Sequence, residues 1–173
     1  MQTFKDWAND NKKSWKFWLV TGLGSGMLRP APGTWGSVVG LILAYVMVHL
    51  GTDPIELSFW CLGLSIIGAK AIDFVHMETG IKDAPEVVVD EVVGQWIALL
   101  PVVALAQGNM LAWLAAFVLF RAFDIMKPWP INVIDRSTTN GAGVILDDVV
   151  AGLVTAVLLY AALVYAPFPV FEI

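Results

Sequence analysis

Five apolar segments joined by short connections constrain the fold of this chain more than any other feature. They cover residues 37–50, 57–71, 87–105, 110–126 and 144–166. A bilayer-spanning helix needs about 20 apolar residues, and the first two segments approach that length with their flanks. Hydrophobic residues make up 58% of the chain and charged residues 14%, whereas soluble domains hold about 45–50% and ~25%. The sequence therefore predicts a protein embedded in a membrane.

We expect an all-α polytopic bundle of about five transmembrane helices. No long polar segment could form a second domain, so residues 1–173 are predicted to be one membrane-embedded domain, with the helical bundle over 21–166. The first sixteen residues are mostly polar or charged, and no cleavable signal peptide is expected. Within residues 1–20, an amphipathic helix over 4–19 is predicted to lie in the headgroup plane. Its apolar face would carry Phe4, Trp7, Trp15 and Trp18.

The basic residues predict the orientation of this bundle. If the N-terminus is cytoplasmic and the five segments alternate in direction, all ten Lys and Arg residues fall on the cytoplasmic side. The opposite side receives only acidic residues, namely Asp53, Glu56 and Glu172. This distribution follows the positive-inside rule. We therefore predict a cytoplasmic N-terminus and a C-terminus on the opposite side.

Acidic residues gather at the cytoplasmic boundary of the same arrangement. Asp90 and Glu91 stand at the start of the third segment, Asp147 and Asp148 at the start of the fifth, and Asp124 near the end of the fourth. Ionised groups are costly inside lipid, so such residues generally mark function. A single acidic pair at a helix start is also favoured by the helix dipole alone. Two basic residues flank Asp124 in the sequence. Arg121, Asp124 and Lys127 stand at positions i, i+3 and i+6, which would place them near one face of a helix.

The charge of this set predicts a cation. Five carboxylates against two bases sum to −5 + 2 = −3, so protons or divalent cations must offset their repulsion. An oxygen-only ligand set without His or Cys suits Mg²⁺, or Mn²⁺ as a substitute. A carboxylate-bound metal at headgroup depth indicates a substrate that carries phosphate. The candidate metal ligands are Asp90, Glu91, Asp124, Asp147 and Asp148.

A glycine-rich stretch, residues 22–37, precedes the first segment. Its backbone N–H groups could surround an anion, with Ser25, Arg29, Thr34 and Ser37 as side-chain donors, or it could be a plain connector. Thr34 or Ser37 is the expected N-cap of the helix that follows. Further along, Gly94 and Gly152 each lie one turn beyond an acidic residue. Glycine at these positions would let neighbouring helices approach the acids closely.

Several classes of function are disfavoured. The net charge of −5 offers no nucleic-acid surface. Cys61 lies in an apolar segment and is expected to be a buried hydrophobe, so neither a disulfide framework nor a thiolate metal site is predicted. His49 and His76 are expected to be incidental, and no histidine base accompanies the serines.

The order of the short motifs resembles the phosphatidylglycerophosphatase A family, over about residues 22–152. The motifs are Gly24-Ser25-Gly26, Pro32-Gly33-Thr34-Trp35-Gly36-Ser37, Lys82-Asp83, Val89-Asp90-Glu91-Val92-Val93-Gly94, Phe120-Arg121-Ala122-Phe123-Asp124, Lys127-Pro128-Trp129-Pro130 and Asp147-Asp148-Val149-Val150-Ala151-Gly152. Residues 28–31 follow the family pattern less regularly, which leaves the role of Arg29 open.

This resemblance implies a Mg²⁺-dependent enzyme of the bacterial inner membrane. Such enzymes hydrolyse the terminal phosphate of phosphatidylglycerophosphate, in glycerophospholipid biosynthesis, at the cytoplasmic face. Transferred to this sequence, Asp90, Glu91, Asp124 and Asp148 become the candidate catalytic residues. Phosphate would contact Arg121, Lys127, Thr34 and Ser37. The lipid tails would remain in the leaflet between the helices.

Two other readings remain open from the residues alone. A small cation transporter would use intramembrane carboxylates, although its acids are expected near mid-span rather than at one boundary. A membrane scaffold that recruits a partner through its loops would leave the cluster of acids and bases unexplained.

Overall fold

The computed structural model describes residues 3–81, 84–129, 131–133 and 140–165. Its elements are α1 (Phe4–Asn11), α2 (Trp15–Val20), η1 (Ser25–Met27), α3 (Pro32–His49), α4 (Pro54–Thr79), α5 (Val89–Leu105), α6 (Met110–Met126) and α8 (Gly141–Tyr165). Within these described ranges there is no β-strand. The all-α prediction is confirmed. Some residues that the predictions above include lie outside the described residues, namely Lys82, Asp83, Pro130, Arg136, residue 166 and Glu172.

Each of the five apolar segments forms a helix, but the ends are set by local chemistry. α4 begins after a capping box in which the Asp53 side chain accepts from the backbone N–H of Glu56. α3 begins five residues earlier than its apolar segment, with Pro32 in the first turn and Ala31 as the N-cap. Proline is well suited to that position because its missing N–H would have no helical partner. The prediction that Thr34 or Ser37 caps α3 is therefore wrong.

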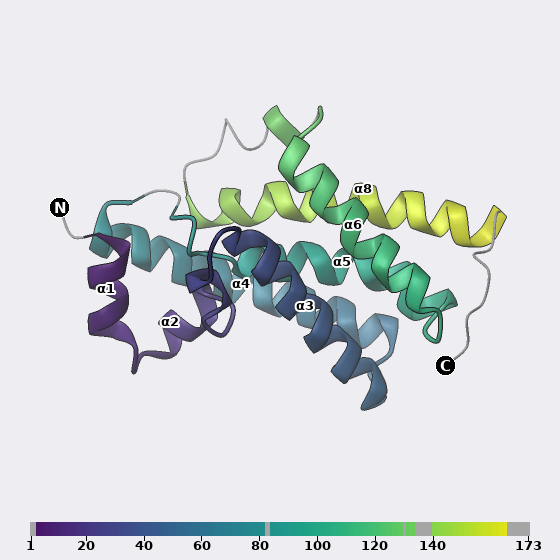
Figure 1. Ribbon diagram of the computed structural model, residues 1–173, viewed down its shortest axis with the longest axis horizontal. Coiled ribbons are helices and arrows are strands. Elements are labelled where there is room, and N and C mark those ends of the chain that lie inside the picture. The colour runs from purple at the N-terminus through teal and green to yellow at the C-terminus, as the bar shows by residue number, and fades with distance from the viewer. Residues whose placement is uncertain (1–2, 82–83, 130, 134–139, 166–173) are drawn as a thin grey trace.

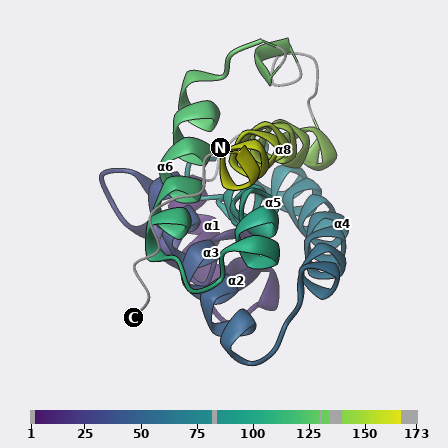
Figure 2. The ribbon, with the colours of Figure 1, turned by 90° about the vertical axis from the view of Figure 1, so that its right-hand side faces the viewer.

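α5 is the central element of the bundle. It packs against α3, α4, α6 and α8, and the end-on view places it among them (Figure 2). Between Val92 and Val103 every residue is buried except the half-buried Leu100. The surrounding helices carry their large apolar side chains outward, as Phe59, Leu62 and Ile66 do on α4. An exterior of this kind is suited to lipid rather than to water.

Glycine allows α5 and α8 to pack closely. A Cβ atom on Gly152 would lie 2.5 Å from the carbonyl oxygen of Gly94, and one on Gly94 would lie 2.5 Å from the Phe120 ring. Both distances are shorter than van der Waals contact, so only glycine fits without movement. The predicted close approach beside the acidic residues is confirmed.

Three helices are long and apolar enough to cross a membrane among the described residues, namely α3, α4 and α8. α5 and α6 have 17 residues each, or about 26 Å at ~1.5 Å per residue. The hydrocarbon core is about 30 Å thick. Five helices are present where five spans were predicted, while a crossing by α5 and α6 remains a prediction.

The predicted single helix over residues 4–19 is divided into α1 and α2. Phe4 and Trp7 are buried, whereas Trp15 and Trp18 are 61% and 46% exposed. The Trp7 indole donates to the Glu78 carboxylate at 2.6 Å, so α1 is held on the end of α4. Figure 1 shows both short helices beside that end of the bundle. The four aromatic residues therefore do not share one lipid-facing surface, because half of them pack on protein.

Candidate active site

Three carboxylates meet where the start of α5 passes α8. Asp90 and Glu91 lie in the first turn of α5, and Asp148 lies in the second turn of α8. One carboxylate oxygen from each lies within 4.8 Å of the other two. The close contact between Gly94 and α8 positions this cluster, since a Cβ on Gly94 would lie 2.7 Å from the Asp148 carbonyl oxygen. We call these three residues the carboxylate triad.

The triad is buried and incompletely hydrogen-bonded. Asp148 is 3% exposed, and Asp90 and Glu91 are half-buried. Asp90 Oδ1, Glu91 Oε2 and Asp148 Oδ2 are inaccessible and accept no hydrogen bond. Three converging carboxylates repel one another and lose hydration in such a place. A divalent cation bound by oxygen ligands would satisfy these atoms, so the triad fits Mg²⁺.

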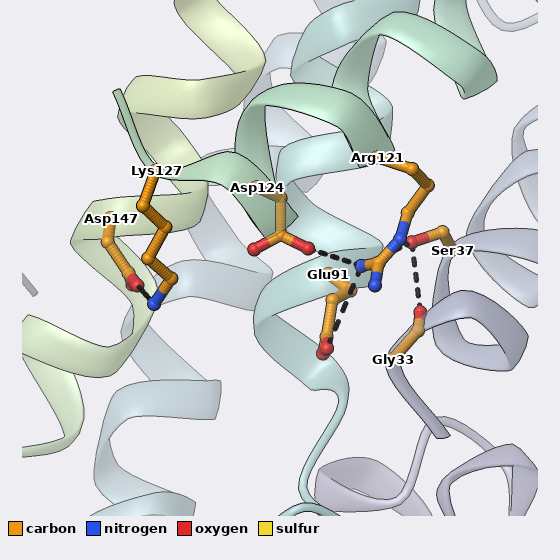
Figure 3. A network of polar contacts seen from close by, with 7 residues as sticks. All are labelled: Gly33, Ser37, Glu91, Arg121, Asp124, Lys127 and Asp147. Carbon is orange, nitrogen blue, oxygen red and sulfur yellow. Dashed lines mark hydrogen bonds and ion pairs between the residues drawn. The ribbon is translucent and has the colours of Figure 1, made fainter. Parts of the chain in front are cut away.

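Arg121 of α6 links the triad to α3. Its Nη1 lies 2.5 Å from Asp124 Oδ2 and 3.9 Å from Glu91 Oε1, and it donates to Ser37 Oγ at 3.3 Å. Ser37 in turn donates to the Gly33 carbonyl at 3.0 Å. These contacts are drawn in Figure 3. The guanidinium is thereby fixed beside the triad, with its planar donors available for an anion.

Lys127 and Asp147 form a second ion pair, which links α6 to α8. Lys127 Nζ lies 2.7 Å from Asp147 Oδ2, with α6 supplying the base and α8 the acid (Figure 3). Lys127 follows the last residue of α6 in a left-handed conformation, with φ of 41°. This conformation is unusual for a residue other than glycine, and such strain tends to occur at functional positions. Lys127 thus leaves the helical register that the i, i+6 spacing assumes.

The N-terminus of α3 closes the site from a third direction. A Cβ atom on Gly33 would lie 2.1 Å from Glu91 Oε1 and 3.1 Å from Arg121 Nη2. The first turn of α3 is therefore in contact with both charged groups, and its N–H groups favour negative charge there. Thr34 is half-buried in the same turn. The structure thus brings Ser37 and the first turn of α3 to the predicted phosphate-binding side.

The five predicted metal ligands divide into two groups. Asp90, Glu91 and Asp148 face one another, while Asp124 and Asp147 are each paired with a base. The sequence could not separate them because all five lie at the same boundary. Three converging carboxylates, of which Glu91 also lies 3.9 Å from Arg121, stand beside the side chains of Arg121 and Lys127. This arrangement can hold one divalent ion and, next to it, a phosphate group.

Arg29 lies apart from this set. Its guanidinium is 2.5 Å from Glu86 Oε1, and the glycine-rich loop packs beneath the segment that leads into α5. A Cβ on Gly26 would lie 2.0 Å from the Glu86 carbonyl oxygen, and Val88 N–H donates to the Val20 carbonyl. The first part of the loop supports the start of α5, and its second part becomes the first turn of α3.

One buried polar residue was not singled out from the sequence. Gln95 lies one turn beyond Glu91 on α5 with no exposed surface, and neither amide atom has a hydrogen-bond partner. A Cβ on Gly40 of α3 would lie 3.4 Å from its Cβ. A polar residue four positions after a site acid, inside an apolar segment, is the signal that could have identified it.

Comparison with known proteins bears on the identity of this site. The chain matches the family described as phosphatidylglycerophosphatase A over residues 18–163. It is 39% identical over 143 residues to phosphatidylglycerophosphatase A of Haemophilus influenzae, covering 83% of this chain and 85% of that protein. The chain belongs to the phosphatidylglycerophosphatase A family. The resemblance seen in its motifs is confirmed.

Two further relatives are similar over most of the chain. Phosphatidylglycerophosphatase A of Escherichia coli K12 is 37% identical over 160 residues, which cover 90% of this chain and 89% of that protein. A Bacteroides thetaiotaomicron relative, provisionally named as a phosphatidylinositol-3-phosphatase, is 34% identical over 151 residues, with 83% and 91% covered. No solved structure gives a significant match. All the motifs quoted from the sequence fall within the matched range. Their described residues contain the triad, lie near it or belong to the segments that pack against it.

Proposed function

We propose that this protein is a Mg²⁺-dependent phosphatase that hydrolyses phosphatidylglycerophosphate to phosphatidylglycerol and inorganic phosphate. The observation that carries the proposal is the triad of Asp90, Glu91 and Asp148, whose carboxylates converge and each hold one buried oxygen without a hydrogen-bond partner. The charged side chains of Arg121 and Lys127 lie nearby, each paired with an aspartate. Membership of the phosphatidylglycerophosphatase A family indicates which substrate to propose. Together they support phosphate-ester hydrolysis at a membrane surface.

The triad would hold Mg²⁺, and each remaining group has a separate task. Bound there, Mg²⁺ supplies polarisation of the phosphoryl group. Arg121 and Lys127 bind the phosphate oxygens, with Ser37, Thr34 and the first N–H groups of α3 as further donors. Asp124 and Asp147 hold the two bases in place. The P–O bond to the headgroup glycerol breaks and a bond from phosphorus to the oxygen of water forms. The departing glycerol oxygen gains the proton that the water loses, so alcohol and inorganic phosphate result.

In the membrane we propose five crossings, with this site at the cytoplasmic leaflet of the bacterial inner membrane. The positive-inside distribution supports that orientation. The exposed Trp15 and Trp18 of α2, with Lys12 and Lys13 beside them, suit the headgroup region. Of the two short helices, only α2 would contact the membrane interface, because the aromatic residues of α1 pack on protein. Lipid tails would stay between the helices while the headgroup reaches the triad.

The decisive assay is phosphate release by the purified protein from phosphatidylglycerophosphate in mixed micelles. We expect turnover with millimolar Mg²⁺ and none with EDTA, and recovery when Mg²⁺ is restored. Absence of phosphate release under all three conditions would contradict the activity. Release that EDTA leaves unchanged would contradict the role of the metal while keeping the phosphatase.

Two further assays test the preferred substrate and the class of protein. The Bacteroides relative's name makes phosphatidylinositol 3-phosphate the proper competing substrate, and we expect a lower kcat/KM on it than on phosphatidylglycerophosphate. Ion flux in proteoliposomes without phosphate release would instead favour a cation transporter. The position of the triad at one end of α5 argues against a mid-membrane ion path.

A further inference from the structure

The start of α8 is held by a residue of α4 that lies outside the active site. Asp73 Oδ1 accepts a hydrogen bond from the backbone N–H of Gly141 at 2.6 Å. Gly141 is the first residue of α8, and its N–H has no partner within its own helix. Asn140 serves a second donor of this first turn, since its side chain accepts from the Gly143 N–H at 3.0 Å. Asp73 therefore caps the first N–H of α8 from a different helix, in addition to Asn140, which precedes α8 in the chain.

The backbones of α4 and α8 approach closely at this point. A Cβ atom on Gly141 would lie 2.1 Å from the Ala69 carbonyl oxygen and 3.1 Å from the Asp73 nitrogen. The two helix backbones thus touch, and the carboxylate closes the contact with a charge-assisted hydrogen bond. Asp73 is itself half-buried, so water competes weakly for its oxygen.

A second fixed point lies eleven residues along α8. Gly152 packs on the Gly94 carbonyl of α5, where a Cβ would lie at 2.5 Å. Asp147 and Asp148 lie between these two contacts, Asp148 two turns after Gly141. A stiff helix held at both ends of a segment has its rotation and its height defined within that segment. Both properties decide whether Asp148 meets Asp90 and Glu91, and whether Asp147 meets Lys127.

We infer that Asp73 is a positioning residue for the active site: by capping α8 it places Asp148 against α5 and Asp147 against Lys127. This inference rests on the proposed function, because it gives Asp148 a role as a metal ligand. Asp73 has no place in the metal set or in phosphate binding. Its effect passes through α8.

The test compares Asp73→Ala with Asp73→Asn in the full-length protein. Asparagine keeps an oxygen that can accept from Gly141, and alanine does not. The first measurement is Mn²⁺ binding by electron paramagnetic resonance without substrate. Residues that orient metal ligands typically change affinity by about 10–100-fold when lost, so Asp73→Ala should raise the Kd for Mn²⁺ about tenfold. Asp73→Asn should stay within about threefold of the wild type.

A matched control separates positioning from general destabilisation. Asp53 caps α4 in a capping box, with its Oδ1 2.8 Å from the Glu56 nitrogen, and lies at the opposite end of α4 from Asp73. Asp53→Ala removes the same kind of bond, so it should lower Tm as Asp73→Ala does but leave Mn²⁺ binding unchanged. Equal loss of Mn²⁺ affinity in both variants would overturn the inference. So would wild-type affinity in Asp73→Ala, or an Asp73→Asn protein as impaired as the alanine variant.

Kinetics on phosphatidylglycerophosphate give an independent readout. Asp73→Ala should lower kcat about tenfold through Asp148 and raise KM about three- to tenfold, because Asp147 then holds Lys127 less firmly. If the wild type binds Mn²⁺ but releases no phosphate, the proposed function fails while the binding comparison still decides the role of Asp73. If the wild type turns over without binding Mn²⁺, wild-type kcat in Asp73→Ala would overturn the inference.

Discussion

Asp124 and Asp147 each face a base, whereas Asp90, Glu91 and Asp148 face one another. This difference in partners predicts different effects of the same chemical change. A carboxylate that binds metal loses its function when it becomes an amide, because the charge that attracts the cation is gone. When a carboxylate that pairs with a base becomes an amide, the base stays charged but is held in position less firmly.

For the triad, we expect Asp90→Asn to abolish turnover while the protein still expresses and folds. The amide keeps the shape of the side chain but removes one of three charges around Mg²⁺, and kcat should fall by about three orders of magnitude or more. The measurement is phosphate release over a range of Mg²⁺ concentrations. Hydrolysis at near the wild-type rate in purified Asp90→Asn would remove Asp90 from the ligand set.

For the paired acids, Asp147→Asn should act on substrate binding instead. Without its partner at 2.7 Å, the Lys127 ammonium is held less firmly, and KM should rise about three- to tenfold, at ~1.4 kcal/mol for each tenfold change. The Mg²⁺ concentration for half-maximal activity should remain within about threefold. A large shift in that Mg²⁺ requirement would show that Asp147 belongs with the metal ligands after all.

At the scale of elements, the contact of α5 with α8 depends on glycine. Gly94→Ala places a methyl group 2.5 Å from the Phe120 ring and 2.7 Å from the Asp148 carbonyl oxygen. Overpacking usually costs about 1–3 kcal/mol, and we expect the upper part of that range because one neighbour is backbone. Tm in detergent and activity should fall together.

The control for that variant is Gly63→Ala on α4. No atom lies within 4 Å of a Cβ at Gly63, and alanine is a better helix former than glycine by about 1 kcal/mol. Gly63→Ala should therefore leave activity unchanged and hold or raise Tm. A Gly94→Ala protein as stable as Gly63→Ala would mean that α5 and α8 can separate without loss.

Helix positions could be predicted from the sequence because apolar runs and prolines act locally. The division of the N-terminal helix could not, because Trp7 and Trp15 have the same periodic pattern. The buried tryptophan, Trp7, is distinguished by contacts that include the Glu78 carboxylate, 71 residues away, and the Phe17 ring. The cap on α8 was beyond reach for the same reason, since Asp73 and Gly141 are brought together by the packing of α4 on α8.

The sequence predicted which residues lie together at the candidate active site, but not which of the acids are paired with a base. Hydropathy and the positive-inside rule placed five acids at one boundary, and the motifs identified the family. Which acid faces a base depends on rotation of α6 and α8 about their axes. The left-handed conformation of Lys127 also alters that pairing, and spacing in the sequence does not encode it.

At the scale of the whole molecule, the number of crossings is open to a direct test. In a Cys61→Ala background, single cysteines at Thr52 and Gly108 mark the connections after α3 and after α5. Five crossings place both on the outer side, so a membrane-impermeant thiol reagent should label both in intact cells. A cysteine at the exposed Lys5 should be labelled only after lysis.

Labelling of Thr52→Cys without Gly108→Cys would contradict five crossings. Because α5 and α6 are each about 26 Å long, they would then enter and leave the membrane from the cytoplasmic side. The triad would keep its position in that case, since it lies at the start of α5 and not at its far end.

The enclosure of α5 has a consequence for how this protein can vary. A helix at the periphery has one stripe of residues that no protein atom contacts, and substitutions there are absorbed by solvent or lipid. From Val92 to Val103 α5 has almost no such stripe. In a complete mutational scan scored by growth, α4 should show a tolerant band along Phe59, Leu62 and Ile66. α5 should be intolerant in every direction, and the only route left for its divergence is compensated change in two helices at once.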